Sequence, residues 1–170
     1  MLDQQHAARL LAQNAARIAA LLQETPAIQA RWRPDPESWS ILEVATHLRD
    51  EEREDFRVRL DIILYHPQDP WPPIDPGGWV TARRYNDGDL DRVATDFQEE
   101  RARSLGWLRG LAAPDWAAMY EAPWGPIRAG DLLASWVAHD LLHLRQLVEL
   151  QWAYTQLLAA PFGTRYAGEW

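Results

Sequence analysis

The chain has 170 residues, of which 47% are hydrophobic and 25% are charged, and these values are typical of a soluble globular domain. The formal net charge of −8 at pH 7 is the opposite of the basic surface that nucleic-acid-binding proteins carry, so we expect no nucleic-acid partner. The sequence has no cysteine, and all 17 basic residues are arginine, which excludes disulfides, thiolate ligands, cysteine nucleophiles and lysine Schiff bases.

Apolar residues at helical spacing predict a first helix over about residues 3–24, which Pro26 ends. A second helix is predicted over residues 41–65. Its start is marked by Ser40 and Glu43, which fit the capping box, a motif in which two side chains satisfy backbone donors at the helix start.

The segment RDEEREDFR in the second helix carries charges of both signs at i,i+4 spacing, which predicts a solvated face. Asp50 and Glu51 are possible exceptions because they lie one turn beyond His47. Prolines and glycines in residues 66–87 predict irregular structure for most of that connector. Connectors of this length are often functional loops or crossovers, and a crossover lets consecutive helices of a bundle run parallel.

A third helix is predicted over residues 90–111, capped by Asp87 or Asp89. Arg101 falls on its apolar line, and we expect this side chain to extend to the surface rather than pair with a buried carboxylate.

The fourth helix is predicted over residues 131–154, with Asp131 as its N-cap, and the tail after it as irregular chain laid over the other helices. The sequence shows no alternation typical of β-strands, no repeat and no linker. It therefore predicts an all-α protein, a four-helix bundle forming one domain over residues 1–170.

Two histidines lie on the apolar face of the fourth helix. His139 and His143 are four residues apart, so their side chains leave the same face one turn apart, which suits two ligands of one metal ion. A lone histidine on such a face is more often a core residue with a hydrogen-bond partner. His47, at the border of the second helix's apolar face, is the candidate third ligand. Three imidazoles with an open coordination position are typical of a catalytic site that activates water or polarises a substrate. Spacing within the helices does not set their stagger, so convergence of the three rings is a hypothesis.

Two other metal sites fit the sequence less well. The motif HDLLH resembles the H-E-x-x-H of zinc proteases, but Asp140 is shorter than the glutamate of that motif and no third ligand follows at a suitable spacing. A ferritin-like di-iron site needs two Glu-x-x-His pairs, which the sequence lacks. We expect Asp140 to anchor a neighbouring helix or orient a ring, and Trp136, on the histidine stripe, to pack in the core.

Two phrases, SWSILEVATHLRDEE and GDLLASWVAHDLLHLRQL, resemble the two signatures of the DinB/YfiT-like superfamily. The resemblance implies a four-helix bundle in an up-down-down-up arrangement, with a long crossover between the second and third helices. It implies one divalent metal ion, such as zinc, nickel, iron or cobalt, held by His47, His139 and His143, and a homodimer. It also implies a small-molecule substrate. The activities of characterised members of that superfamily are thiol-S-transfer with a low-molecular-weight thiol, such as bacillithiol or mycothiol, and maleylpyruvate isomerase-like reactions.

Two functional hypotheses follow. The first is a metal-dependent enzyme, a thiol-S-transferase or a related hydrolase or isomerase. The alternative is a non-catalytic, metal-stabilised dimeric bundle that acts as a binding module. No run of 18 apolar residues is present, and the first residues lack the layout of a signal peptide, so we expect a cytoplasmic protein with no membrane partner.

Overall fold

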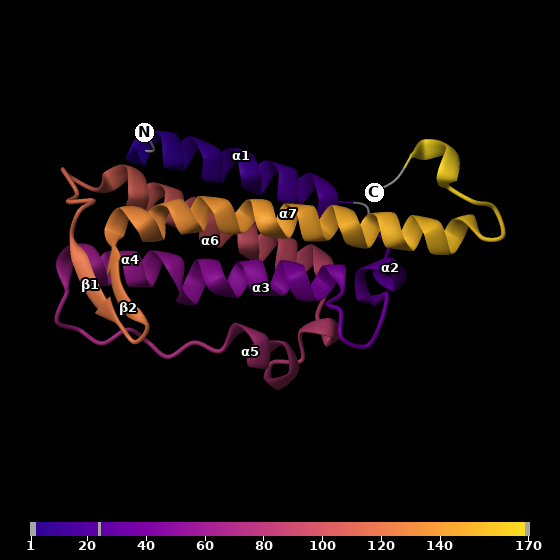
Figure 1. Ribbon diagram of the computed structural model, residues 1–170, viewed down its shortest axis with the longest axis horizontal. Coiled ribbons are helices and arrows are strands. Elements are labelled where there is room, and N and C mark those ends of the chain that lie inside the picture. The colour runs from indigo at the N-terminus through magenta and orange to yellow at the C-terminus, as the bar shows by residue number, and fades with distance from the viewer. Residues whose placement is uncertain (1–2, 24, 169–170) are drawn as a thin grey trace.

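Four long helical rods packed side by side form the body of the protein in the computed structural model, which describes residues 3–23 and 25–168 (Figure 1). The rods are α1 (Gln4–Leu22), α3 (Ile41–Glu54) continued by α4 (Phe56–Tyr65), α6 (Leu90–Gly110) and α7 (Ala129–Ala159). The predicted four-helix bundle is therefore confirmed. None of the described helices is long and apolar enough to cross a membrane.

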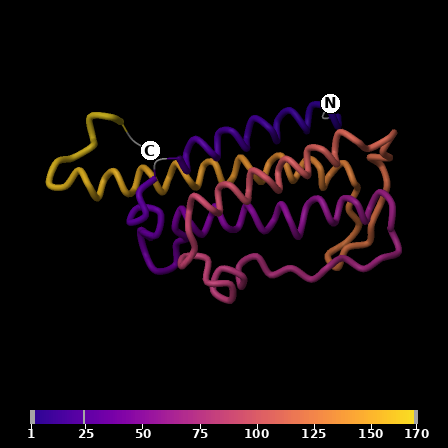
Figure 2. The backbone as a smooth tube through the Cα atoms, turned by 180° about the vertical axis from the view of Figure 1, so that it is seen from behind, coloured from indigo at the N-terminus to yellow at the C-terminus, as the bar shows by residue number. Residues whose placement is uncertain are grey.

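Hydrogen bonds between helix ends define the directions of the rods. The Ser40 hydroxyl, just before α3, donates to Asn86, just before α6, at 2.7 Å, so these helices start at the same end. Gln151, late in α7, donates to the carbonyl of Leu21, at the end of α1, at 2.9 Å, so these two run parallel to each other. Opposite views show α1 and α7 running one way and α3 and α6 the other (Figures 1 and 2).

Two helix boundaries differ from the sequence predictions. The second helix breaks at Asp55, whose φ of −114° and ψ of −91° are not helical, so α3 and α4 replace one continuous helix. The fourth helix starts at Ala129, and Asp131 is not its N-cap. The Asp131 carboxylate instead accepts from the backbone N–H of Arg128, at 3.4 Å, and from its guanidinium, at 2.8 Å. The predicted end of the first helix, at Glu24, lies outside the described residues.

A short β-hairpin precedes α7, and the sequence did not predict it. Strand β1 (Met119–Ala122) pairs antiparallel with β2 (Gly125–Arg128). Tyr120 of β1 stacks on Trp71, with ring centroids 4.6 Å apart, and its hydroxyl accepts from the Trp71 backbone N–H at 3.0 Å. The hairpin thus holds the start of the crossover against one end of the bundle.

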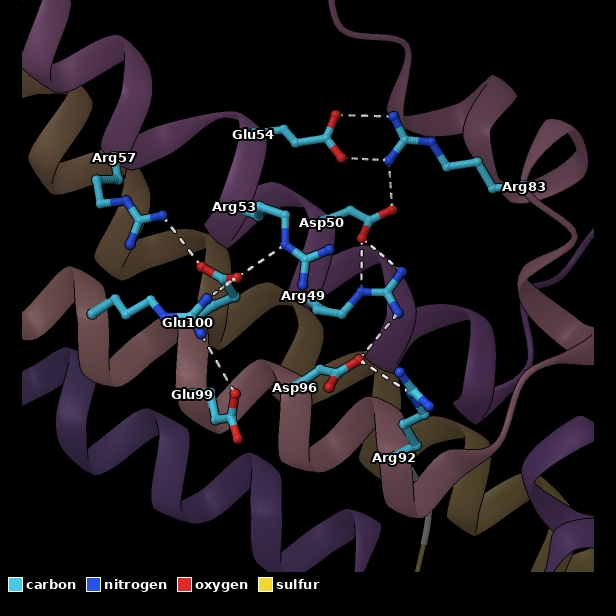
Figure 3. Close-up of polar contacts among 11 residues, drawn as sticks. Arg49, Asp50, Arg53, Glu54, Arg57, Arg83, Arg92, Asp96, Glu99 and Glu100 are labelled. Atoms are coloured by element: carbon cyan, nitrogen blue, oxygen red, sulfur yellow. Dashed lines mark hydrogen bonds and ion pairs between the residues drawn. The ribbon is translucent and has the colours of Figure 1, made fainter.

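The crossover between α4 and α6 runs along the face of the bundle beside α3 (Figure 1). It contains α5 (Pro76–Ala82) and the 3₁₀ turn η1 (Tyr85–Asp87), and the short helix α2 (Ala27–Arg31) lies near its far end. Arg83 makes two hydrogen bonds to Glu54, at 2.6 and 2.9 Å, and one to Asp50, at 2.7 Å (Figure 3). Asp50 also accepts from the Tyr85 hydroxyl at 2.7 Å. Asp50 therefore holds the crossover onto α3.

The prediction of a solvated face for the segment RDEEREDFR is wrong for Glu52 and Asp55, whereas Asp50 and Glu51, named as exceptions, are buried. Asp50, Glu51, Glu52 and Asp55 are all buried. Arginines of the segment also pair with a buried acid of another helix. Arg53 and Arg57, together with Arg103 of α6, form ion pairs with the buried Glu100 of α6 (Figure 3). Mixed charges at i,i+4 spacing thus reflect pairing between helices as well as exposure to solvent.

Residues 160–168, which follow α7, do not cover the bundle, so the prediction that the tail lies over the other helices is wrong. Helix α7 projects past the ends of its neighbours, and the following residues stand away from the bundle (Figure 1). Phe162 is 81% exposed there, and the short 3₁₀ turn η2 (Arg165–Ala167) has no buried residue.

Candidate metal centre

The three histidines selected from the sequence lie together between α3 and α7. The Nε2 atom of His47 is 3.3 Å from Nε2 of His139 and 3.1 Å from Nε2 of His143, and the latter two atoms are 3.1 Å apart. Within residues 3–23 and 25–168, this is the single group of three or more His, Cys, Asp or Glu side chains placed to hold a metal ion. The stagger that the sequence left open therefore brings the rings together.

A buried ionic network sets this stagger. Arg101 of α6 is 2% exposed; its Nε donates to Glu52 of α3 at 2.9 Å, and its two terminal nitrogens donate to Asp140 of α7 at 2.8 and 2.9 Å. One of those nitrogens also donates to the carbonyl of Leu11 of α1 at 2.8 Å. Arg101 thus ties the four rods together, and the expectation that it reaches the surface is wrong.

The carboxylates of this network are close in sequence to the histidines. Glu52 lies five residues after His47, and Asp140 directly follows His139. Trp136 Nε1 donates to the second oxygen of Glu52 at 2.9 Å. The height of α3 against α7 is therefore fixed next to the rings, and the predictions that Asp140 anchors a helix and that Trp136 packs in the core are confirmed.

All three imidazoles are held in the neutral form. Burial, with a smaller effect from His143, lowers the pKa of His47 to about 3, against the opposing influence of Asp50. Burial and the two neighbouring imidazoles lower the pKa of His139 to about 2, with Arg101 adding to the effect. Burial also lowers the pKa of His143. A neutral imidazole keeps a nitrogen lone pair, which is what a metal ion requires.

The ring nitrogens fit a metal ion better than they fit one another. A hydrogen bond between two imidazole nitrogens needs one nitrogen with a proton and one with a free lone pair. The three Nε2 atoms lie in mutual contact, so they cannot all carry a proton. Nδ1 of His143 lies 2.8 Å from the side-chain oxygen of Gln146, and an N–H donated there leaves its Nε2 free to act as a ligand. The donor set of three imidazoles suits zinc, nickel, iron or cobalt.

Aromatic rings enclose the inner side of the centre. Phe56 contacts the ring of His139, with centroids 5.0 Å apart, and stacks on Trp136 at 5.8 Å. Trp39, just before α3, lies against His47 with ring centroids 5.1 Å apart. Phe56 and Trp136 therefore cover the side of the imidazoles that faces the core, whereas Trp39 lies beside His47 at the edge of the centre.

The outer side of the centre meets a cavity of about 580 Å³. The residues before α3 form one wall, including Glu37 and Trp39, and the second half of α7 forms the other, including His143, Gln146 and Glu149. Of the three histidines, only His143 lines this cavity. A small molecule can therefore approach the histidines from the His143 side.

A buried pair of acids lies beyond the centre. Glu51, one turn after His47, is 4% exposed, and burial together with Asp55 raises its pKa to about 8. Burial also raises the pKa of Asp55. Both acids therefore hold their protons to a higher pH than they would in water. Glu51 Oε1 has no hydrogen-bond partner among the described residues.

Sequence reasoning missed several residues that support the centre. Gln146 follows His143 by three residues on the same helical face, so its spacing could have identified it. The sequence did not distinguish Glu52 from the other acidic residues of the charged run, and no pattern predicted that Arg101 pairs with it.

The comparisons with known proteins agree with the fold. A family model described as the DinB superfamily matches residues 10–147. Among solved structures, the chain is similar to YfiT from Bacillus subtilis, described as a probable metal-dependent hydrolase with an unusual four-helix bundle topology. The sequence identity is 19%, the TM-score is 0.76, and the match covers 86% of this chain and 85% of that chain. At this identity the likeness shows the fold alone. No curated protein matches the chain significantly.

Proposed function

Since this chain belongs to the DinB superfamily, we propose that it is a divalent-metal-dependent enzyme whose ion is held by His47, His139 and His143. The observation that carries the proposal is the convergence of three neutral imidazoles, one buried and two half-buried, whose Nε2 atoms lie 3.1 to 3.3 Å apart. Three protein ligands leave coordination positions open, which is the property of catalytic rather than structural sites.

A divalent ion at this position would act as a Lewis acid and lower the pKa of a thiol or water molecule that reaches it. The residues of the chain do the positioning. Gln146 fixes the tautomer of His143, and Arg101 holds α3 and α7 at the height that brings the rings together. Phe56 and Trp136 exclude water on the core side. The cavity beside His143 admits a small-molecule substrate.

The reaction we propose is transfer of a low-molecular-weight thiol to an electrophile, or a related hydrolysis or isomerisation. Hydrolysis is included because the structurally similar YfiT is described as a probable metal-dependent hydrolase. No cysteine is present in the chain, so a reacting thiol would have to come from a second substrate. A cytoplasmic location would supply such thiols in reduced form.

The alternative is a non-catalytic dimeric bundle in which the ion stabilises the fold. Exposed apolar residues on α7 favour a second copy of the chain as a partner, since Leu141 is 52%, Leu142 57% and Val148 36% exposed. A homodimer is compatible with either function. The two functions differ in what removal of the ion does, because a structural ion contributes directly to folding.

Metal analysis of the purified protein tests the proposal. We expect about one ion per chain in the wild type and loss of the ion in His47→Ala. His66→Ala is the matched control, because the His66 side chain is 58% exposed and lies at the start of the crossover. Full metal content in His47→Ala would refute the three-histidine site. Loss of turnover on chelation, with a folded protein remaining, separates the enzyme from the metal-stabilised module.

A further inference from the structure

The cavity beside the histidine centre carries negative charge. Two carboxylate side chains, Glu37 and Glu149, line it from opposite walls, and no arginine does. Arg33, on the same segment as Glu37, turns away and pairs with Glu43 at the start of α3. The chain as a whole has a formal charge of −8, so its net charge does not oppose this local charge.

The two carboxylates differ in how far they are compensated. Glu149 lies 3.3 Å from Arg145 on the exposed surface of α7, and Arg145 belongs to a separate groove, beside Leu144 and Val148. Glu37 makes no ion pair within the described part of the chain. Glu37 therefore leaves a formal negative charge without an ion-pair partner in the wall of this cavity.

The remaining walls suit an apolar group beside a cation. Trp39 presents its indole to the cavity while its ring also contacts His47, and Leu150 contributes an apolar side chain from α7. The face of an indole attracts cations in addition to apolar groups. At the inner end, His143 and Gln146 place the histidine centre within reach of a bound molecule.

We propose that this cavity is the substrate site and that it selects small molecules carrying an organic ammonium group. The ammonium lies between Glu37 and Glu149, its apolar body lies against Trp39 and Leu150, and its reacting group points toward His143. This inference rests on the proposed function, and it narrows the substrate class to amine-bearing thiols or electrophiles. Substrates whose body carries a carboxylate are repelled by the same two side chains.

Binding of three matched probes tests the selection: 2-phenylethylamine, 2-phenylethanol and phenylacetate. They share an aromatic body and differ in charge, and calorimetry or NMR titration in the millimolar range suits ligands of this size. We expect the amine to bind about tenfold more tightly than the alcohol, and phenylacetate to bind most weakly, because each exposed carboxylate contributes about three- to fivefold. Comparable affinities for the three probes, a preference for phenylacetate, or no measurable binding of the amine would overturn the proposal.

Charge-neutralising variants test whether Glu37 and Glu149 cause the preference for the amine. Glu37→Gln and Glu149→Gln should each weaken binding of the amine about three- to fivefold, and the double variant should bind amine and alcohol about equally. Glu99→Gln is the control, because it removes the same charge from the exposed surface of α6, where the Glu99 side chain is 61% exposed. An unchanged preference in the double variant, or an equal loss in the control, would also overturn the proposal.

The same titrations distinguish this inference from the proposed function. The carboxylates and the indole do not depend on a bound ion, so the preference for the amine is expected both in the protein as purified and after chelation. Full metal content in His47→Ala would refute the three-histidine site and leave the charge preference measurable. A normal metal content with no charge preference would refute the cationic pocket alone.

Discussion

Replacing Arg101 with leucine should be among the most destabilising substitutions in the protein. Arg101 makes four hydrogen bonds of 2.8 to 2.9 Å, three of them to the carboxylates of Glu52 and Asp140. The variant leaves both carboxylates buried without their cation. Asp140 loses two donors, whereas Glu52 keeps the indole N–H of Trp136.

The expected cost follows from the burial of these groups. Four charge-assisted bonds would sum to about 6 to 12 kcal/mol if each acted alone, but desolvation of the ions offsets much of that sum. Breaking a buried ion pair by removing one partner costs about 3 to 5 kcal/mol, and the two orphaned carboxylates place Arg101→Leu near the upper end. Since whole domains are stable by about 5 to 15 kcal/mol, this variant should be close to unfolding.

Urea denaturation of the metal-free protein measures this cost. Arg103→Leu is the control, because Arg103 lies two residues away with a side chain 60% exposed, and its loss should cost less than about 1 kcal/mol. Arg101→Lys keeps the charge but loses the paired geometry, so it should recover only part of the stability. Equal unfolding free energies for Arg101→Leu and Arg103→Leu would refute the view that the buried network holds the rods together.

Three further predictions concern titration and the outer shell of the centre. Because the folded-state pKa of His47 is about 3 and that of His139 about 2, below the ordinary value of 6.5, the unfolded chain binds more protons below pH 6.5. The metal-free protein should therefore lose stability as the pH falls from 6.5 toward 3, by up to about 1.4 kcal/mol per pH unit for each ring, and denaturation across this range in wild type and His139→Gln should show a smaller loss in the variant. Glu51 changes stability with pH in the opposite direction, because its pKa of about 8 lies above the ordinary 4.5. Its contribution to folding stability is fully present below pH 4.5 and is lost as the pH rises to 8. Glu51→Gln should therefore lose less stability than wild type between pH 5 and about 8, and parallel curves would contradict the raised pKa. Gln146→Leu should weaken zinc binding about 10- to 100-fold, measured by competition with a chelator, whereas Gln156→Leu on the exposed end of α7 should leave it unchanged; equal affinities would exclude the hydrogen bond as a support of the site.

The parts of the site that lie within one helix were predictable from the sequence. His139 and His143 share a face because a helix repeats every 3.6 residues, and no tertiary information is needed for that inference. The approach of His47 depends on the height of α3 against α7. That height is fixed by Arg101, which is 49 residues from Glu52 and 39 from Asp140. Periodicity within a helix holds no information about such contacts.

The wrong predictions for Arg101 and for the charged run share a physical origin. An arginine on an apolar line can extend to solvent or meet buried carboxylates, and the choice depends on side chains from other helices. The burial of Glu52 in the charged run was missed for the same reason, because its partners Arg101 and Trp136 lie on α6 and α7. The hairpin was missed because strands of four residues, joined by Pro123 and Trp124, are too short to show alternation.

The histidine centre therefore has two sides with separate roles. On the core side, Arg101 and its carboxylates fix where the rings stand, and every member of that network is buried. On the open side, Glu37 and Glu149 face the cavity and contribute little to holding the helices together. Helix α7 carries groups of both kinds on successive turns, from Asp140 through His143 to Glu149. Changes in the charge of the cavity can thus alter substrate preference without moving the rings, since the residues that set the height of α7 do not line the cavity.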